Sequence, residues 1–110
     1  MNIYNRSSLI TFYRKHPKSK IQLEVWYEEV MSKKWKSPNY CKADYGTSVS
    51  ILKNNRVVFN IKGNEYRIVA AINYENGWLF IKFIGTHSEY DKINANSIDF
   101  FKLKSKRKGN

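Results

Sequence analysis

The chain has 110 residues, and its 20 Lys and Arg against 9 Asp and Glu give a net charge of +11. This length suits one domain with a single modest core, and 42% hydrophobic and 15% aromatic residues exclude intrinsic disorder for most of the chain. No apolar run approaches the ~20 residues of a membrane span, and no secretion signal is visible. The single cysteine, Cys41, excludes an internal disulfide. We therefore expect a cytosolic protein that is not bound to a membrane.

The positive charge favours a polyanionic partner, with nucleic acid first and an anionic membrane second. A lysine-rich surface without such a partner would give the same composition. Residues 1–20 and residues 102–110 each carry five Lys or Arg and no acid, so the chain without its last nine residues still has a charge of +6, which is +11 minus five. We predict one domain over residues 1–101 and a basic C-terminal tail over residues 102–110.

Two amphipathic helices are predicted near the N-terminus. Apolar or aromatic residues recur at helical spacing, first as Leu9, Phe12, Tyr13 and His16 and then as Leu23, Trp26, Tyr27 and Val30. We expect Ser7 or Ser8 to cap the first helix and Pro17 to end it. The run Ser19-Lys20-Ile21-Gln22 predicts a capping box for the second helix. The short link between the two predicts an antiparallel hairpin.

Residues 35–48 show no period and predict a loop that can hold a short helical turn, and the chain beyond them predicts a β-meander. Four strands are expected, at Val49–Lys53, Arg56–Ile61, Tyr66–Ile72 and Trp78–Ile84. Asn54-Asn55 and Asn76-Gly77 are typical of tight hairpin turns. The predicted fold class is α+β, with the helical hairpin packed on one face of an antiparallel sheet of about four strands.

Candidate chemical groups gather around the last two strands. Arg67 interrupts an apolar strand, and His87, Tyr90 and Lys92 follow the final strand. Since the two strands are neighbours in a meander, these side chains can meet at one edge of the sheet. Arg67 would stabilise charge on a phosphate, and His87 would act as general acid or base. Tyr90 would stack on a base, and Lys92 would hold phosphate or assist the acid.

Other chemistries have weaker signals. No nucleotide-binding loop, HExxH motif or nucleophile elbow occurs. Two histidines and one cysteine make a metal site improbable, and we predict neither a metal nor a cofactor. A nucleophilic pair of Cys41 with His87 exists on paper, without any supporting residues around the cysteine.

Two segments resemble the HigB family of bacterial toxins, within the RelE-like group of type II toxin–antitoxin systems. They are Phe59-Asn60-Ile61-x-Gly63-Asn64-x-Tyr66-Arg67-Ile68-Val69 and Thr86-His87-x-Glu89-Tyr90-Asp91-Lys92-Ile93. The resemblance implies an endoribonuclease that cleaves mRNA on the ribosome without a metal, by attack of the RNA 2′-hydroxyl on the adjacent phosphate. It also implies neutralisation by a HigA-like helix-turn-helix antitoxin, and we expect the toxin itself to be monomeric. Further expected RNA contacts are Lys62, Asn64, Tyr66, Lys82, Lys104 and Arg107.

Structural roles compete with these assignments. His87 can cap the last strand, and Arg67 can pair with Glu65 or Glu89 instead of a phosphate. Gly63 and Asn64 are typical turn residues, Glu89 can orient His87, and Tyr66 can belong to the core. The three tryptophans, Trp26, Trp35 and Trp78, are expected in the core. A non-catalytic RNA-binding module and a protein-interaction domain with an acidic partner stay open as rival functions.

Overall fold

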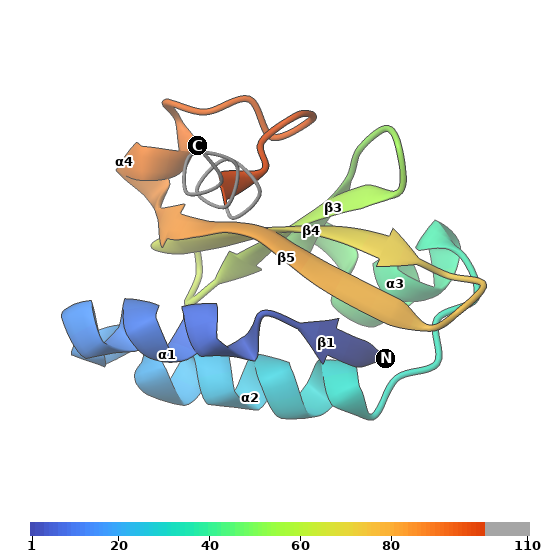
Figure 1. Ribbon diagram of the computed structural model, residues 1–110, viewed down its shortest axis with the longest axis horizontal. Helices are drawn as coiled ribbons and strands as arrows, with labels where there is room; N and C mark the ends of the chain where they lie inside the picture. Colours follow the sequence, from blue (N-terminus) through green and yellow to red (C-terminus); the bar gives the residue numbers. More distant parts are fainter. Residues whose placement is uncertain (101–110) are drawn as a thin grey trace, which may run out of the picture.

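The structure, a computed structural model, describes residues 1–100 and shows two helices packed under a twisted sheet (Figure 1). In chain order the elements are β1 (Asn2–Tyr4), α1 (Arg6–Lys15), η1 (Pro17–Ser19), α2 (Lys20–Met31), α3 (Pro38–Tyr45), η2 (Gly46–Ser48), β2 (Val49–Ile51), β3 (Arg56–Ile61), β4 (Tyr66–Asn73), β5 (Trp78–Thr86) and α4 (His87–Tyr90). The α+β class and the helical hairpin on one face are confirmed. None of the helices in residues 1–100 has the length and apolarity that a bilayer crossing needs.

The sheet has five strands in the order β1-β5-β4-β3-β2. Strands β2 to β5 pair antiparallel, which confirms the predicted meander, and the register sets Arg67 opposite both Asn60 and Gly85. The fifth strand was not predicted: β1 pairs parallel to β5, with Ile3 opposite Leu79. A three-residue strand is too short to show a period in the sequence.

Two turns of the meander use positive φ angles. Asn54 and Asn55 have φ of 59° and 60°, as the hairpin turn predicted from the Asn-Asn pair requires. Between β3 and β4 the positive angles fall on Lys62 and Gly63, at 53° and 64°. Gly63 is therefore a turn residue as expected, while the second positive φ of this turn belongs to Lys62 and not to Asn64.

Each face of the sheet has its own apolar cluster. The face toward α1 and α2 holds the main core, in which Leu23, Phe59, Ile68 and Leu79 are almost fully buried. The second face carries a smaller cluster around Val58, Val69 and Phe83. Alternation along the strands explains this division, because successive side chains point to opposite faces.

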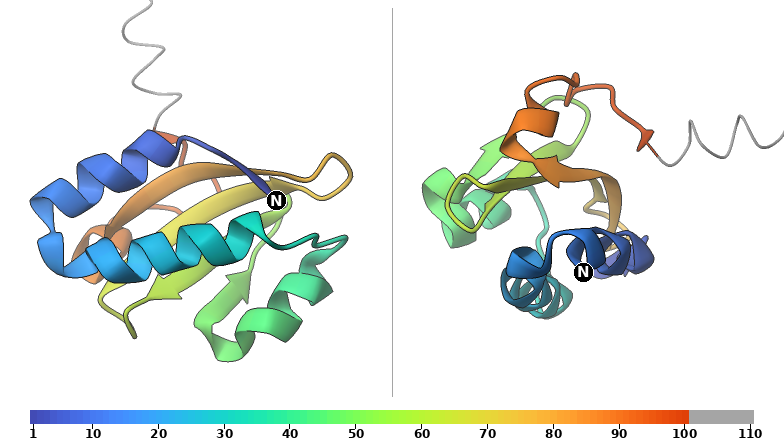
Figure 2. Two further views of the ribbon diagram at one scale, coloured as in Figure 1. Left: turned by 90° about the horizontal axis from the view of Figure 1, so that it is seen from below. Right: turned by 90° about the vertical axis from the view of Figure 1, so that its left-hand side faces the viewer.

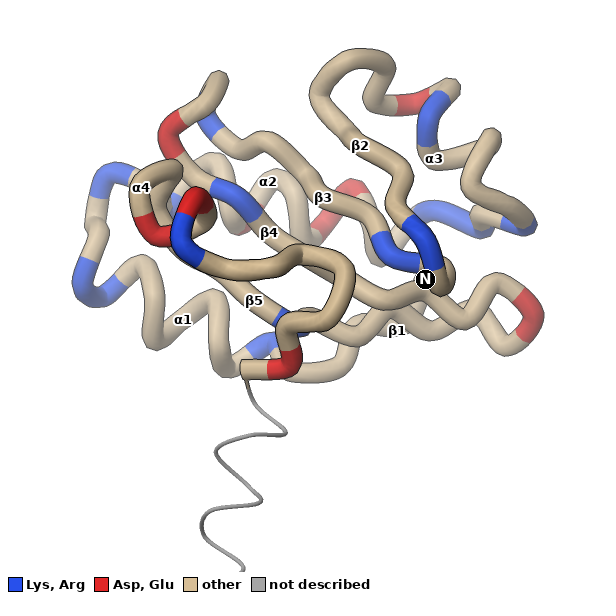
Figure 3. Tube along the Cα trace, turned by 90° about the horizontal axis from the view of Figure 1, so that it is seen from above, with Lys and Arg blue, Asp and Glu red and all other residues tan. Residues whose placement is uncertain are grey.

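The chain after β5 covers part of the second face. In Figure 3, seen from above, α4 and the segment that follows it lie over β4 and β5. Ile93 and Ile98 of this segment pack on the second-face cluster. The Nη1 of Arg56 donates to the carbonyls of Ala95 and Ile98, at 3.1 and 2.6 Å, and so holds the segment down.

Local details near the N-terminus differ from the predictions. Helix α1 begins at Arg6 after Asn5, which has a φ of 76° and makes no side-chain cap. Ser8 does not cap the helix, because its hydroxyl donates to the Asn5 carbonyl. Ser19 precedes α2, but no capping box forms there, since the Ser19 hydroxyl donates back to the His16 carbonyl.

Three further predictions were incomplete or wrong. The expected loop at residues 35–48 contains α3, an eight-residue helix that buries Cys41. The expected strand at Val49–Lys53 is shorter, ending at Ile51. Trp26 and Trp35 lie in the core, whereas Trp78 is 39% exposed beside Phe80.

Candidate active site at one end of the sheet

Arg67 points away from the helices, on the second face of the sheet. Its Nη1 donates to the Asn64 carbonyl at 2.9 Å, and its guanidinium carbon lies 5.5 Å from the centre of the Tyr90 ring. Neither Glu65 nor Glu89 pairs with it, and no carboxylate among residues 1–100 forms an ion pair with it. The structural alternatives for Arg67 are therefore wrong, and its charge stays available to a ligand.

Helix α4 carries His87 and places Tyr90 beside Arg67. The helix starts with a capping box: the Thr86 hydroxyl accepts from the Glu89 N–H, and the Glu89 carboxylate accepts from the Thr86 N–H. This reciprocal arrangement satisfies two backbone donors that a helix start would otherwise leave unpaired. Glu89 therefore organises the helix backbone and does not orient the His87 ring.

His87 lies at the start of α4 with more than half of its side chain exposed. Its backbone N–H donates to the Glu65 carbonyl at 2.9 Å, which ties α4 to the turn between β3 and β4. Its Nε2 lies 3.7 Å from the carboxylate of Asp91, one helical turn further on.

Three more of the predicted residues surround this group. Lys62 forms an ion pair of 3.1 Å with Glu65, Asn64 contributes its carbonyl to Arg67, and Lys92 is exposed at the end of α4. No carboxylate of residues 1–100 pairs with Lys92. Neither Arg67 nor Lys92 is therefore neutralised by a carboxylate of residues 1–100.

Tyr66 lies elsewhere, in the main core. Its ring packs edge-on against Phe12 with 5.6 Å between centroids, near His16, and only 6% of the residue is exposed. A ring covered in this way cannot stack on a base, so we assign Tyr66 to the core and not to RNA contact. Its place in the alternation of β4, on the same face as Ile68, was a signal for this role.

The remaining predicted residues are not part of the group. Lys82 is held by Asp99 in an ion pair of 3.3 Å, beside the irregular register between β4 and β5. Lys104 and Arg107 lie outside the described residues. Cys41 is fully buried in the main core, and burial raises the pKa of its thiol to about 12. A protonated, buried thiol is a poor nucleophile, which argues against a pair of Cys41 with His87.

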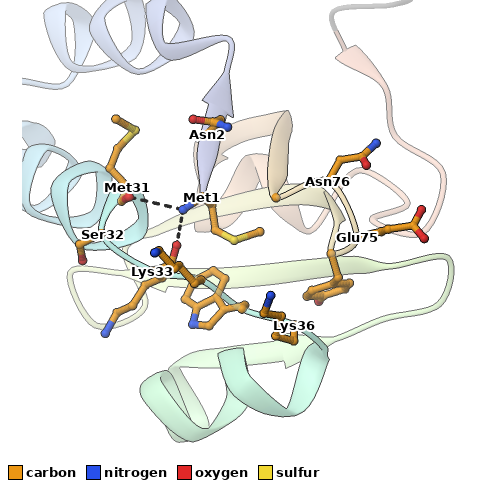
Figure 4. Close-up of a pocket in the computed structure, with 12 residues that line it drawn as sticks. Met1, Asn2, Met31, Ser32, Lys33, Lys36, Glu75 and Asn76 are labelled. Atoms are coloured by element: carbon orange, nitrogen blue, oxygen red, sulfur yellow. Dashed lines mark hydrogen bonds between the residues drawn. The ribbon is translucent and has the colours of Figure 1, made fainter.

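A hollow lies at the opposite end of the sheet, between the N-terminus and the β4–β5 turn. Figure 4 shows it around Met1, whose amino group donates to the carbonyls of Met31 and Lys33. Its volume is about 400 Å³, and it contains none of the predicted site residues. The candidate group at α4 is instead an open surface, which suits a polymer substrate better than a small molecule.

The sequence did not reveal two contributors to the site. No role was predicted for Asp91, although its i, i+4 spacing from His87 on a helix was a usable signal. Gly85 was not considered, yet a Cβ there would lie 2.5 Å from Phe83 Cζ and 2.9 Å from Glu89 Oε1. Glycine at this position therefore lets α4 fold back over the sheet.

Comparisons with known proteins agree with this arrangement. The family model HigB_toxin, described as the RelE-like toxic component of a toxin-antitoxin system, matches residues 19–93. The mRNA interferase toxin HigB of Escherichia coli K12 is 30% identical over 97 residues, which are 86% of this chain and 92% of that protein. The mRNA interferase HigB of Escherichia coli O6:H1 strain CFT073 is 27% identical over 94 residues, covering 84% and 91%.

The helices under the sheet and the matched family define the class as RelE-like toxins. Within that class, the chain belongs to the HigB family, since the family match spans most of it. Members of this family are the toxic components of toxin–antitoxin systems, and the family therefore implies an antitoxin partner.

Proposed function

We propose that this chain is an endoribonuclease that cleaves mRNA on the ribosome in the cytoplasm and so inhibits translation and growth. The observation that carries the proposal is the contact of Arg67 with Tyr90 at the end of the sheet where α4 also carries an exposed His87. The name mRNA interferase, borne by relatives that this chain covers almost end to end, supports the same substrate.

The proposed chemistry is an internal transfer within the RNA. The 2′-oxygen forms a new bond to the adjacent phosphorus, the bond from phosphorus to the 5′-oxygen breaks, and a 2′,3′-cyclic phosphate remains. One proton leaves the 2′-hydroxyl and one reaches the departing 5′-oxygen. The protein needs no nucleophile of its own, so its contribution is positioning, proton transfer and stabilisation of charge.

The residues of the site divide these tasks among themselves. His87 transfers a proton, and the Asp91 carboxylate lies 3.7 Å from its Nε2. Arg67, held over the Tyr90 ring, stabilises the extra negative charge on the phosphate. Lys92 adds positive charge, and the exposed part of Tyr90 offers a stacking surface to a base.

The donor set supports a reaction without a metal. Among residues 1–100, no group of three or more His, Cys, Asp or Glu side chains is close enough to hold a metal ion. The proposed partners are mRNA, the ribosome and a HigA-like helix-turn-helix antitoxin, and the toxin acts as a monomer. Cleavage on ribosomes should therefore persist when EDTA removes zinc and other transition metals while magnesium is kept in excess to hold the ribosomes intact.

The test is single-turnover cleavage of mRNA on programmed ribosomes by folded variants. His87→Ala should lower the rate by about 10²–10⁴, as loss of a general acid or base does, and Arg67→Ala by about 10²–10³. Lys92→Ala should have a smaller effect. Ser88→Ala and Arg14→Ala are matched controls, because both side chains are exposed and lie outside the group.

Tyr90 separates stacking from proton transfer. Tyr90→Phe should be milder than Tyr90→Ala if the ring stacks on a base, and equally severe if the hydroxyl carries a proton. Wild-type cleavage rates for both His87→Ala and Arg67→Ala would show that the active site lies elsewhere. RNA that is bound but never cut would instead support a non-catalytic RNA-binding module.

A further inference from the structure

The outward side of α2 exposes aliphatic side chains that nothing in residues 1–100 covers. Ile21 is 70% exposed and Val25, one helical turn later, is 50% exposed. Figure 2, in the view from below, shows α1 and α2 side by side as the outer layer of the molecule. We call the exposed side of this helix, from Ile21 to Glu29, the α2 surface. Adjacent aliphatic groups at such exposure are typical of a surface that binds another protein.

The α2 surface also has the opposite charge to the rest of the chain. Glu24 and Glu28 lie on one side of the aliphatic pair, and Glu29 lies on the other. Helix α2 holds three of the chain's nine acids but only one base, Lys20, while the whole chain has a charge of +11. This surface repels a polyanion such as RNA and attracts basic side chains.

A groove beside the helix contains polar atoms that lack partners. Gln22 and Trp26 line a hollow of about 320 Å³ that runs from α2 to Ile61 at the end of β3. The Trp26 Nε1 and the Gln22 Oε1 are buried, and neither has a hydrogen-bond partner among residues 1–100. Trp26 is 98% buried, since 2% of it is exposed. Buried polar groups in folded proteins nearly always find partners, and these two atoms stay unpaired within residues 1–100.

A second copy of this chain fits the α2 surface poorly. In a symmetric dimer the same patch meets itself, which would place Glu24 and Glu28 of one copy near the same acids of the other. Like charges facing each other in an interface cost binding energy. The charge pattern therefore favours a different protein, one that presents Lys or Arg around apolar residues.

We propose that the α2 surface docks a segment of the antitoxin that carries aliphatic side chains flanked by Lys or Arg. Its aliphatic groups would cover Ile21 and Val25, and its cations would face the glutamates. The choice of the antitoxin as partner rests on the proposed function. The exposed aliphatic and acidic side chains of the α2 surface do not depend on whether the chain cleaves RNA.

The experiment measures binding of the purified toxin to the purified antitoxin encoded with it, by isothermal titration calorimetry. The double variant Ile21→Ser with Val25→Ser should raise Kd by about 10- to 100-fold, as loss of anchoring side chains at an interface does. The matched control is Ile51→Ser, because Ile51 is an exposed aliphatic residue on β2, at 39%. It should leave Kd within twofold of wild type.

A charge reversal gives a second, independent arm. Glu24→Lys with Glu28→Lys should weaken antitoxin binding at low salt and abolish its decrease with added salt, while Glu75→Lys, exposed near the β4–β5 turn, should not. Hydrogen exchange on the complex should show new protection in residues 20–31. Thermal unfolding of every variant checks that the fold is retained, since all the replaced side chains are exposed.

The outcomes keep this inference separate from the proposed function. Unchanged Kd in both double variants, or new protection confined to α4, would overturn the docking site. Loss of RNA affinity with intact antitoxin binding would assign the α2 surface to RNA and would also overturn it. A wild-type toxin that binds the antitoxin as described but cuts no mRNA would refute only the proposed function. In the absence of antitoxin, the variants of the α2 surface should cleave mRNA at wild-type rates.

Discussion

Gly85→Ala tests whether the close approach of α4 to the sheet is needed for the site. Gly85 stands opposite Arg67 in β5, and an added Cβ would lie 2.5 Å from Phe83 Cζ and 2.9 Å from Glu89 Oε1. The first contact involves a ring packed in the second-face cluster, and the second involves the carboxylate of the capping box. Neither neighbour can give way without disturbing the structure that carries His87.

The sign of the change in the free energy of unfolding distinguishes a tightly packed site at Gly85 from an open one. Gly85 does not have a positive φ, so alanine would stabilise an open site by about 0.4–1 kcal/mol through the unfolded chain. Overpacking a tight site costs about 1–3 kcal/mol, and the clash distances place Gly85→Ala in that regime. We expect a net loss of about 1–2 kcal/mol in the free energy of unfolding.

The assay is urea unfolding followed by tryptophan fluorescence. With a slope of about 1–2 kcal/mol per molar urea for a chain of this size, the midpoint should fall by roughly 1 M. Single-turnover mRNA cleavage by the folded fraction should fall as well, because α4 must shift. A midpoint that stays or rises would refute the argument.

A double-mutant cycle identifies the clashing group. Leucine at position 83 lacks the two ring atoms that approach Gly85 most closely, Cζ and Cε2. Gly85→Ala should therefore cost less in a Phe83→Leu background than in the wild type, by about 0.5 kcal/mol or more for a contacting pair. Strict additivity would place the strain elsewhere.

Four further predictions concern Arg56, Cys41, Asp44 and the basic C-terminal tail. Arg56→Gln should lower the free energy of unfolding by about 1–3 kcal/mol and speed hydrogen exchange in residues 91–98, because two carbonyls lose their donor. Cys41 should resist iodoacetamide at pH 8 in the native state and react after unfolding in guanidinium, since burial raises its thiol pKa to about 12. The hydrogen bond from Trp35 lowers the pKa of the Asp44 carboxyl below 3.8. The ionised carboxylate therefore stabilises the fold fully above its unfolded-state pKa, and this stabilisation is lost as the pH falls through the folded-state pKa. The urea midpoint of Asp44→Asn should accordingly depend less on pH below 4 than that of the wild type. Deleting residues 102–110 should weaken RNA binding and flatten its salt dependence, because five cations are lost, while an altered cleavage position would place the tail in the recognition site.

Local signals explain which parts of the fold could be predicted. The Asn54-Asn55 turn was recognisable because positive φ angles are tolerated by few residues. Strand β1 could not be predicted, because its pairing with β5 is parallel and joins residues more than 70 positions apart. Helix α3 has one buried apolar residue, Cys41, so no amphipathic period was present to reveal it.

Capping boxes show how the same signal can mislead. The Thr-x-x-Glu spacing at Thr86 is a genuine box that starts α4. The similar Ser-x-x-Gln spacing at Ser19 is not, because the preceding 3₁₀ turn gives the Ser19 hydroxyl a nearer acceptor at the His16 carbonyl. A capping-box motif therefore indicates a possible helix start, and the geometry of the residues before it determines whether the box forms.

Main-chain bonds hold the candidate site together, and this determines what substitutions in it can show. The link from α4 to the β3–β4 turn runs through the His87 N–H and the Glu65 carbonyl, which His87→Ala retains. The start of α4 depends on Thr86 and Glu89 and on neither proposed catalytic residue. Arg67→Ala removes one hydrogen bond to an exposed carbonyl and a ring contact of 5.5 Å. Because the framework does not depend on these two side chains, a folded variant that no longer cleaves mRNA would have lost chemistry, and a folded variant that still cleaves would show that the chemistry lies elsewhere.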